Sequence, residues 1–511
     1  MSARQDSDNL AWDRSDDLWE KAIKHVRLSS TCRKIDSFTE KIFAKPATMI
    51  TPLIIGGFNV LYPFRIEGIA GHVLVRLPCP NQAPVPEEKT LAEAATAAYI
   101  SQHTQVPIPK LFNYGIDAEI GPFMIIEDLG TRRSVSEILE TPREDPNDVP
   151  VLNPDIAETK LKSVYLAMAR LVLQLAQPSF QRIGSLAETT PGSCQFDVAA
   201  RPLTLNMSNM VQLANIPKAI FPPKGTTYQT ADAWYTALAD MHIATLLFQH
   251  NDMITSEDDC KTKYVARQLF RRPARQGRLS TFGFAQDDWS ASASAAHHHN
   301  DTAGTAATRR LPAPSGSSAF RLWSDDFRPV NILVDEEDNI RGAIDWEFAY
   351  AAPTQFALDP PWWLLLDVPE MWDAGIDDWA EVYEGRLGTW LAAMEEAERD
   401  MEGGRGSLLL LSAYMRESWA TGRFWLNYAA RKSWAFDTVY WKYLDERFFG
   451  EREEEVPAEE LWRTRVELLR EDERAGMEEM VRIKMEEAKE RVLVEWEDEE
   501  ARERLSSFLF D

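Results

Sequence analysis

The sequence contains no apolar run long enough to cross a bilayer, and its start, MSARQDSDNLAWDRSDD, lacks the apolar core of a secretory signal. Basic residues are few: 55 Lys and Arg stand against 81 Asp and Glu, a formal net charge of -26. Nucleic acids and anionic membranes, which need a basic face, are therefore disfavoured as partners. The four cysteines show no C-x-x-C spacing, so neither a zinc ribbon nor a small disulfide framework is indicated. We expect a cytoplasmic protein in a reducing compartment.

The composition predicts a folded chain with more than one lobe. At 511 residues the chain exceeds what one hydrophobic core usually serves, and 44% hydrophobic and 27% charged residues are typical of a globular protein. Residues 1–45 form a polar, partly helical extension. The segment TPLIIGGFNVLYPFRIEGIAGHVLVRLPCP then indicates short strands, followed by a helix in EEKTLAEAATAAYISQHTQ and a buried strand in GPFMIIEDLG. We therefore predict a small β-rich N-lobe over residues 46–130.

The second lobe, residues 131–450, is predicted to be mainly helical. Apolar residues recur at helical spacing over residues 156–176 and in ADAWYTALADMHIATLLFQH, so both segments should be core helices. Residues 274–318 are rich in Ser, Ala, Gly, Thr and Pro, which favours a mobile low-complexity insertion. Its adjacent His297, His298 and His299 could bind a metal ion. A solvated tract is favoured, because neighbouring histidines in a flexible segment do not preorganise a tetrahedral site.

The last segment, residues 451–511, is predicted to hold a charged amphipathic helix. Its apolar residues repeat at steps of three and four: Met477, Val481, Met485, Ala488, Val492 and Trp496. Such a helix usually packs on its own domain. A partner-binding or coiled-coil role is the alternative.

One stretch, SDDFRPVNILVDEEDNIRGAIDWEFAY (residues 324–350), combines oxygen ligands with two apolar runs. It fits a β-hairpin that turns at residues 335–339 and brings Asn331 at its entrance beside Asp345 at its exit. One Asp and one Asn suit Mg²⁺, which takes few protein oxygens and completes its shell with water and phosphates. Asp326, on the entering loop, could accept the proton of an attacking hydroxyl, as phosphoryl transfer from ATP requires. Chance turn residues are the alternative.

This D-x-x-x-x-N pattern, with IDWE after it and a small β-rich lobe before it, resembles the aminoglycoside phosphotransferase and choline kinase-like phosphotransferase family, especially its fungal members. The resemblance runs from about Pro52 to Phe449, interrupted by the insertion. It implies an α+β, bilobal protein-kinase-like fold. It also implies an ATP- and Mg²⁺-dependent enzyme that moves the terminal phosphoryl group of ATP to a hydroxyl of a small molecule. Aminoglycosides, choline-like amines, sugars and amino alcohols would all suit such a centre, so the acceptor is left open.

Carried over by position, the resemblance makes Asp326 the catalytic base and Asn331 and Asp345 the magnesium ligands. In the small lobe it implies nucleotide contacts by the turn at Gly56 and Gly57, by Arg76 in place of the usual lysine with Glu93 as its ion-pair partner, and by the inter-lobe linker at Glu127 and Leu129. A surface ion pair and a plain hairpin turn are the alternatives for the arginine and the glycines. Asp359, in LDPPWW, matches a structural Asp that braces the catalytic loop.

The chain also departs from the family pattern. Ser324 stands where a bracing His is usual, Arg328 stands where a second His is usual, and no G-x-G-x-x-G is present. These departures favour an alternative: a catalytically weak or inactive pseudokinase that acts as a nucleotide-binding or protein-interaction scaffold, with a protein partner on the C-terminal helix. A protein kinase is disfavoured, because no D-F-G or A-P-E segment follows Asn331. The segment PEMWDAGIDDWAEVYE could form an acidic, aromatic pocket for a cationic or ring-shaped substrate, although a solvated helix face is favoured.

Overall fold

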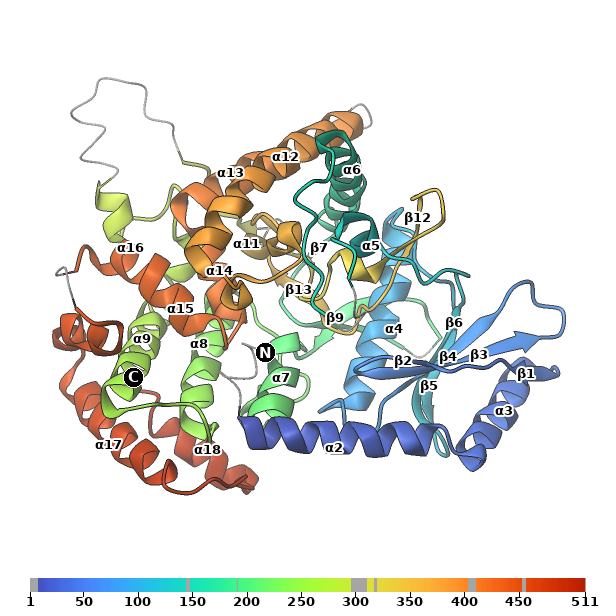
Figure 1. The fold of residues 1–511 in the computed structure, drawn as a ribbon, viewed down its shortest axis with the longest axis horizontal. Coiled ribbons are helices and arrows are strands. Elements are labelled where there is room, and N and C mark those ends of the chain that lie inside the picture. The colour runs from blue at the N-terminus through green and yellow to red at the C-terminus, as the bar shows by residue number, and fades with distance from the viewer. Residues whose placement is uncertain are drawn as a thin grey trace.

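The chain folds into two lobes. The computed structural model describes residues 8–143, 148–190, 192–295, 310–316, 319–402, 410–452 and 456–510. A β-sheet with few helices forms the smaller N-lobe, and helices dominate the larger C-lobe (Figure 1). The predicted α+β class with a β-rich N-lobe and a mainly helical C-lobe is confirmed. Within the described residues, none of the helices combines the length and the apolar character needed to span a membrane.

The N-lobe is built on one antiparallel sheet with the strand order β1-β3-β4-β6-β5, and β2 pairs with β3 outside this path. The strands are β1 (Ala47–Met49), β2 (Ile54–Ile55), β3 (Asn59–Ile66), β4 (Val73–Pro78), β5 (Leu111–Asp117) and β6 (Gly121–Glu127), and helix α4 (Pro86–His103) lies between β4 and β5. Alternation of buried side chains gives the sheet two apolar faces. One face packs Leu74, Met124 and Ile126 against Ala94 of α4. Phe38 of the N-terminal extension packs in the core of the other face.

The N-terminal extension consists of two helices, α2 (Asn9–Val26) and α3 (Ser29–Phe43). Figure 1 shows α2 running along the lower edge of the molecule from α7 to α3. At the N-lobe end, Tyr62 donates a hydrogen bond to the carbonyl of Val26 at 2.9 Å. At the other end, the backbone amide of Asp8 donates to the carbonyl of Leu213, at 3.1 Å. Helix α2 therefore contacts both lobes.

The C-lobe contains most of the helices of the chain. They are α5 (Val135–Leu139), α6 (Glu158–Leu175), α7 (Leu205–Ala214), α8 (Ala231–Phe248), α9 (Glu257–Arg275), α11 (Thr354–Ala357), α12 (Ile376–Glu402), α13 (Leu411–Thr421), α14 (Arg423–Arg431), α15 (Phe436–Val439), α16 (Asp445–Phe449), α17 (Glu471–Glu487) and α18 (Asp498–Ser506). Both predicted core helices are present, as α6 and α8, and the apolar side chains of α6 that were predicted to face the core are buried.

Short strands complete the C-lobe. They are β7 (Ser179–Phe180), β8 (Ser185–Glu188), β9 (Phe196–Ala200), β10 (Phe320–Ser324), β11 (Ile332–Val334), β12 (Ile340–Ala343) and β13 (Ala349–Pro353). Strand β10 lies between β13 and β7, and β11 pairs with β12 as a hairpin. These two small sheets support the segment between residues 324 and 345, which faces the N-lobe.

A histidine in the core of the C-lobe predicts a pH dependence of stability. His242 of α8 is 1% exposed and stacks on Phe436, with ring centroids 4.2 Å apart. Burial, assisted by the charge of Arg267, lowers the pKa of His242 to about 3. The unfolded chain therefore binds a proton that the folded chain does not, and stability falls as the pH decreases below about 6.5. We expect His242 to remove about 2 kcal/mol of unfolding free energy between pH 8 and pH 5.

Urea denaturation at several pH values measures this effect. His242→Gln should flatten the dependence between pH 8 and pH 5, whereas His25→Gln, which changes an exposed histidine, should leave it as in the wild type. Equal slopes in the wild type and His242→Gln would contradict the assignment.

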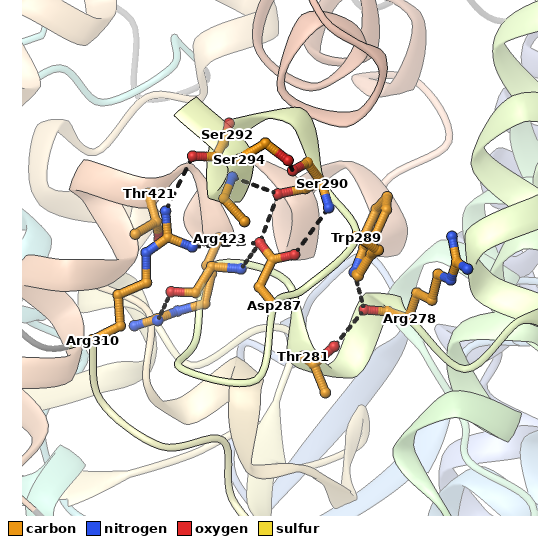
Figure 2. Close-up of polar contacts among 12 residues, drawn as sticks. Arg278, Thr281, Asp287, Trp289, Ser290, Ser292, Ser294, Arg310, Thr421 and Arg423 are labelled. Atoms are coloured by element: carbon orange, nitrogen blue, oxygen red, sulfur yellow. Dashed lines mark hydrogen bonds and ion pairs between the residues drawn. The ribbon is translucent and has the colours of Figure 1, made fainter. Parts of the chain in front are cut away.

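The first part of the predicted mobile insertion, residues 274–295, packs on the C-lobe through its aromatic residues. Within residues 274–295, Phe282 and Phe284 are at most 1% exposed. Figure 2 shows Asp287 at the centre of this segment, where it accepts from the backbone amide and hydroxyl of Ser290 at 3.2 and 2.8 Å. Arg423 of α14 donates to the carbonyl of Gly283 at 3.0 Å, which ties the segment to the C-lobe. His297, His298 and His299 lie outside the described residues.

The C-terminal segment is not one helix. It forms short 3-10 turns, then α17 and α18, with a turn at residues 488–490 and irregular backbone at residues 491–497 between them. The buried residues of α17 include Met477, Met480 and Val481, and α17 packs on α9 of the same C-lobe. The predicted continuation of the apolar repeat to Val492 and Trp496 is wrong, because α17 ends at Glu487.

Residues 488–497 lie beside the N-terminal part of α2. Asn251 donates through Nδ2 both to the carboxylate of Asp8, at 2.9 Å, and to the carbonyl of Val492, at 2.8 Å. Arg14 forms an ion pair with Glu495 at 3.0 Å. Asn251 therefore binds both the N-cap residue of α2 and the backbone of the C-terminal segment.

Candidate active site

A cleft of about 550 Å³ lies between the lobes. Its lining includes almost all of the positions singled out in the sequence: Gly56, Gly57, Arg76, Glu127, Leu129, Asp326, Asn331 and Asp345. Glu93 lies behind the lining, buried at 3% exposure. Residues that are up to 289 positions apart in the chain therefore share one cavity.

The segment that carries the three oxygen ligands is a loop followed by a hairpin. Strand β10 ends at Ser324, a single 3-10 turn (Pro329–Asn331) follows, and β11 and β12 pair with Ile332 opposite Ala343. The hairpin turns at residues 335–339, where the amide of Asp335 donates to the carbonyl of Asn339 at 3.0 Å. The amide of Ile344 donates to the carbonyl of Asn331 at 2.9 Å. Asn331 and Asp345 are therefore held at the same end of the hairpin.

Asp326 lies in the cleft and has two polar partners. Asn331 donates through Nδ2 to the backbone carbonyl of Asp326 at 2.8 Å and to its Oδ2 at 3.0 Å. The Nε of Arg328 donates to Oδ1 at 2.7 Å. Burial raises the pKa of Asp326; Arg328 opposes this shift and Asp345 adds to it. A carboxylate in this setting is a better proton acceptor than an exposed one.

The neighbouring Asp325 has a different environment. It accepts from the indole Nε1 of Trp323 at 2.9 Å and from the amide of Leu205, in the first turn of α7, at 3.3 Å. Arg431 lies 3.8 Å from its Oδ1. Asp325 therefore joins the loop to α7 and α14, which is the bracing role that the sequence assigned to Asp359. Asp359 instead accepts from Ser418 and Asn427, at 2.6 and 2.8 Å, and holds α13 and α14.

Arg76 of β4 connects the two lobes across the cleft. Its Nη1 lies 2.6 Å from Oδ1 of Asp345, and its Nη2 lies 3.0 Å from Glu93 and 3.5 Å from Glu347. Arg76 is 5% exposed. Burial raises the pKa of Glu93 to about 7, against the opposing effect of Arg76. A surface ion pair, the alternative reading for Arg76 and Glu93, is excluded by this burial.

Sequence reasoning missed a second buried cluster beside Arg76. Lys89, in the first turn of α4, forms an ion pair with Glu347 and donates to the side chain of Asn59 at 3.0 Å. Asn59 in turn donates to Glu347 at 2.9 Å. Burial acts to raise the pKa of Glu347, but Lys89 and Arg76 outweigh it and the pKa is lowered. The only sequence signal was the position of Glu347, two residues after Asp345 in IDWE.

The N-lobe contributes a turn and a linker to the cleft. The amide of Gly56 donates to the carbonyl of Asn59 at 2.8 Å, which closes the turn between β2 and β3. A Cβ atom added at Gly57 would meet no atom within 4 Å, so the backbone here is open to a ligand. In the linker, the amide of Glu127 already donates to the carbonyl of Lys110, at 2.9 Å. The amide of Glu127 is therefore already paired within the protein.

The oxygens at the end of the hairpin fit Mg²⁺. Because Asn331 uses Nδ2 for Asp326, its Oδ1 is the amide atom left for a cation. Arg76 contacts Oδ1 of Asp345, and the side chain of Asp345 is 30% exposed. The backbone of Asp345 has a left-handed φ of 62°. A strained non-glycine backbone at such a position is typical of functional sites. In the described part of the chain no group of three His, Cys, Asp or Glu residues could hold a metal ion, so a cation here would need the amide and non-protein ligands.

The acidic, aromatic segment of residues 369–384 is not an open pocket. Trp379 is fully buried, Glu370 accepts from the hydroxyl of Tyr428 at 2.6 Å, and Asp377 forms an ion pair with Lys442 at 2.8 Å. Its buried rings belong to the C-lobe core, whereas Asp377 and Asp378 are exposed in the first turn of α12, as the favoured solvated helix face predicts.

No protein-family model and no curated protein matches this chain. Among solved structures, the chain is similar to a thermostable mutant of the aminoglycoside phosphotransferase APH(4)-Ia in a ternary complex with AMP-PNP and hygromycin B (13% identity, TM-score 0.36, covering 80% of this chain and 97% of that one). It is also similar to macrolide 2'-phosphotransferase type I (11%, TM-score 0.35, 83% and 99%). A third is the spectinomycin phosphotransferase APH(9)-Ia in complex with ADP and spectinomycin (12%, TM-score 0.29, 81% and 93%). All three are phosphotransferases, the class that the sequence resembles.

Proposed function

We propose that the chain is an ATP- and Mg²⁺-dependent O-phosphotransferase that moves the terminal phosphoryl group of ATP to a hydroxyl of a small molecule. One observation carries the proposal: Asp326, Asn331, Asp345 and Arg76 meet in a single inter-lobe cleft that also contains the glycine turn and the linker. Phosphoryl transfer needs a base, oxygen ligands for a metal and a cation for the phosphates, and this set supplies each of them.

Each residue has a role that follows from its contacts. Asp326 would accept the proton of the acceptor hydroxyl, and Asn331 orients it through the two hydrogen bonds from Nδ2. Asn331 and Asp345 would hold Mg²⁺, which when bound neutralises charge on the phosphates. Arg76 would bind phosphate oxygens, for which its planar fork is suited. In this role Arg76 shares its charge between Asp345, 2.6 Å away, and the nucleotide.

A nucleotide-binding scaffold without activity is the second candidate function. The ion pair of Arg328 with Asp326, at 2.7 Å, favours it, because a carboxylate paired with an arginine is a weaker base. Ser324 contacts the same loop through its Oγ, which accepts from the backbone amide of Asp326 at 3.3 Å. A protein partner on the C-terminal segment would have to bind its charged face, because the apolar side of α17 is buried.

Calorimetric titration of ATP, with and without Mg²⁺, tests the proposed metal site. We expect binding to depend on Mg²⁺ and to weaken at least about tenfold in Asp345→Asn, because the variant loses a charged ligand to the metal. The matched control is Asp335→Asn, an acid in the turn of the same hairpin that does not line the cleft. Absence of ATP binding by the wild type under both conditions would contradict the proposal, and equal binding by Asp345→Asn would remove Asp345 from the metal site.

A further inference from the structure

Two cations of the protein already cover the aromatic rings beside the catalytic loop. The guanidinium of Arg431 lies 4.4 Å from the ring centroid of Trp323. The Nζ of Lys432 lies 4.8 Å from the ring of Trp362 and 4.9 Å from that of Tyr428. Ring faces attract cations, and these faces are occupied. An acceptor with an ammonium group would therefore meet positive charge here instead of a free aromatic surface.

In the described part of the chain, only one of these two cations is paired with a carboxylate. Arg431 lies 3.8 Å from Asp325, which balances its charge. Within the described residues, Lys432 has no carboxylate oxygen within 4.0 Å of Nζ. The nearest acid that acts on it, Glu370, is hydrogen-bonded to Tyr428. The amine of Lys432 is therefore not paired directly with a carboxylate of the described residues.

Arg328 adds a second cation, inside the cleft. Its Nε donates to Oδ1 of Asp326 at 2.7 Å, and its side chain is 40% exposed and lines the cavity. The ion pair uses one edge of the guanidinium, so the terminal Nη groups are available to a ligand that lies next to Asp326. Arg328 is close enough to Lys432 to lower its pKa, although burial is the larger cause. Lys432 lies near the same loop, because its neighbour Arg431 is 3.8 Å from Asp325, the residue before Asp326.

We propose that Arg328, supported by Lys432, binds an anionic group of the acceptor and so selects acceptors that carry a carboxylate or a phosphate as well as the reacting hydroxyl. The proposal rests on the proposed function. With the anion on the terminal Nη groups of Arg328, a hydroxyl one or two carbons away reaches Asp326, because both contacts belong to the same ion pair. A fork of N–H donors matches the planar carboxylate and the phosphate equally well, so the chemistry common to both is a small oxyanion.

Calorimetry with simple anions tests the site without relying on turnover. Inorganic phosphate and malonate are titrated separately into the full-length chain loaded with Mg²⁺ and AMP-PNP, and into the chain without nucleotide. We expect one of the two anions to bind, and Arg328→Gln to weaken its affinity at least about tenfold, the loss typical of a charge-assisted hydrogen bond. Lys432→Met should weaken it less. Which anion binds better distinguishes a phosphate-bearing from a carboxylate-bearing acceptor.

Arg132→Gln is the matched control, because Arg132 also lines the cleft but its Nη1 and Nη2 both donate to Asp128, at 2.8 and 3.1 Å. It should bind the anion as the wild type does. Equal affinity in the wild type and Arg328→Gln, or no saturable binding of either anion, overturns the proposal. If AMP-PNP fails to bind while the anion still binds through Arg328, the proposed function fails and the anion site stands. If the nucleotide binds but no anion binds through Arg328, the anion site fails and the proposed function stands.

A turnover assay with three matched diols provides an independent measurement. Glycerate, propane-1,2-diol and (2,3-dihydroxypropyl)trimethylammonium share the same two hydroxyls and differ in charge. We expect the highest kcat/KM with glycerate, and a selective loss of about tenfold for glycerate alone in Arg328→Gln. A preference for the ammonium compound that survives in Arg328→Gln overturns the proposal.

Discussion

Asp326→Asn should lower the rate of phosphoryl transfer by about 10²- to 10⁴-fold, the contribution of a positioned general base. The substitution removes the proton acceptor but keeps the size of the side chain, and Arg76, Asn331 and Asp345 remain in place to bind the nucleotide. ADP release measures the rate, and titration calorimetry measures ATP affinity, which we expect to change by less than about threefold.

Asp325→Asn is the matched control for this substitution. Asp325 has the same chemistry one residue earlier, yet it contacts Trp323, Leu205 and Arg431 and does not line the cleft. Asp325→Asn should lower the free energy of unfolding, whereas the rate per folded molecule should stay close to that of the wild type. If Asp325→Asn abolishes turnover and Asp326→Asn does not, the wrong carboxylate of the pair has been taken as the base.

Arg76→Met should reduce the free energy of unfolding by about 3–5 kcal/mol, the usual cost of removing one partner from a buried ion pair. The substitution would leave Glu93 and Glu347, both less than 5% exposed, without their shared cation, although Lys89 still neutralises Glu347. Urea denaturation monitored by tryptophan fluorescence measures the loss. ATP binding should be lost in the same variant, because the phosphates and Asp345 lose the same cation.

Two further substitutions separate charge from geometry at this position. Arg76→Lys keeps the charge but cannot reach Asp345 and Glu93 at once, so it should lose part of the stability and part of the affinity. Arg65→Met, on the neighbouring strand β3, removes an exposed arginine and should change stability by less than about 0.5 kcal/mol. An Arg76→Met variant as stable as the wild type would mean that the buried cluster contributes no net stability.

The sequence predicted the parts of the site that local patterns encode. Asn331 and Asp345 flank a hairpin whose turn residues and apolar runs are visible in the sequence, and the hairpin alone places them together. The contact of Lys89 with Glu347 has no such signal, because it joins residues 258 positions apart that lie in different lobes. From the sequence alone, a lysine in the first turn of a helix is predicted to be solvated, because its partner in the other lobe is not visible.

Composition misled the prediction for residues 274–295, the first part of the predicted insertion. Serine, alanine and glycine outnumber the apolar residues there, but Phe282 and Phe284 are enough to anchor the described part on the C-lobe. Gly283 has a φ of 73°, and a Cβ atom at this position would lie 2.6 Å from the Thr421 hydroxyl, so the glycine that suggested flexibility is required by close packing. In the C-terminal segment, the apolar repeat of the sequence continues past Glu487, but helix α17 ends there. Beyond the helix, Asn251 binds the backbone carbonyl of Val492.

The junction at Asn251 has a consequence for the order of folding. Arg14 and Glu495 are 481 positions apart, and Asn251 must hold Asp8 and Val492 together. During synthesis α2 is made long before residues 488–497, so this junction closes only after those residues have been made. Because contacts of such large sequence separation form slowly, α2 should become protected late during refolding, even though it is made before its C-terminal partners.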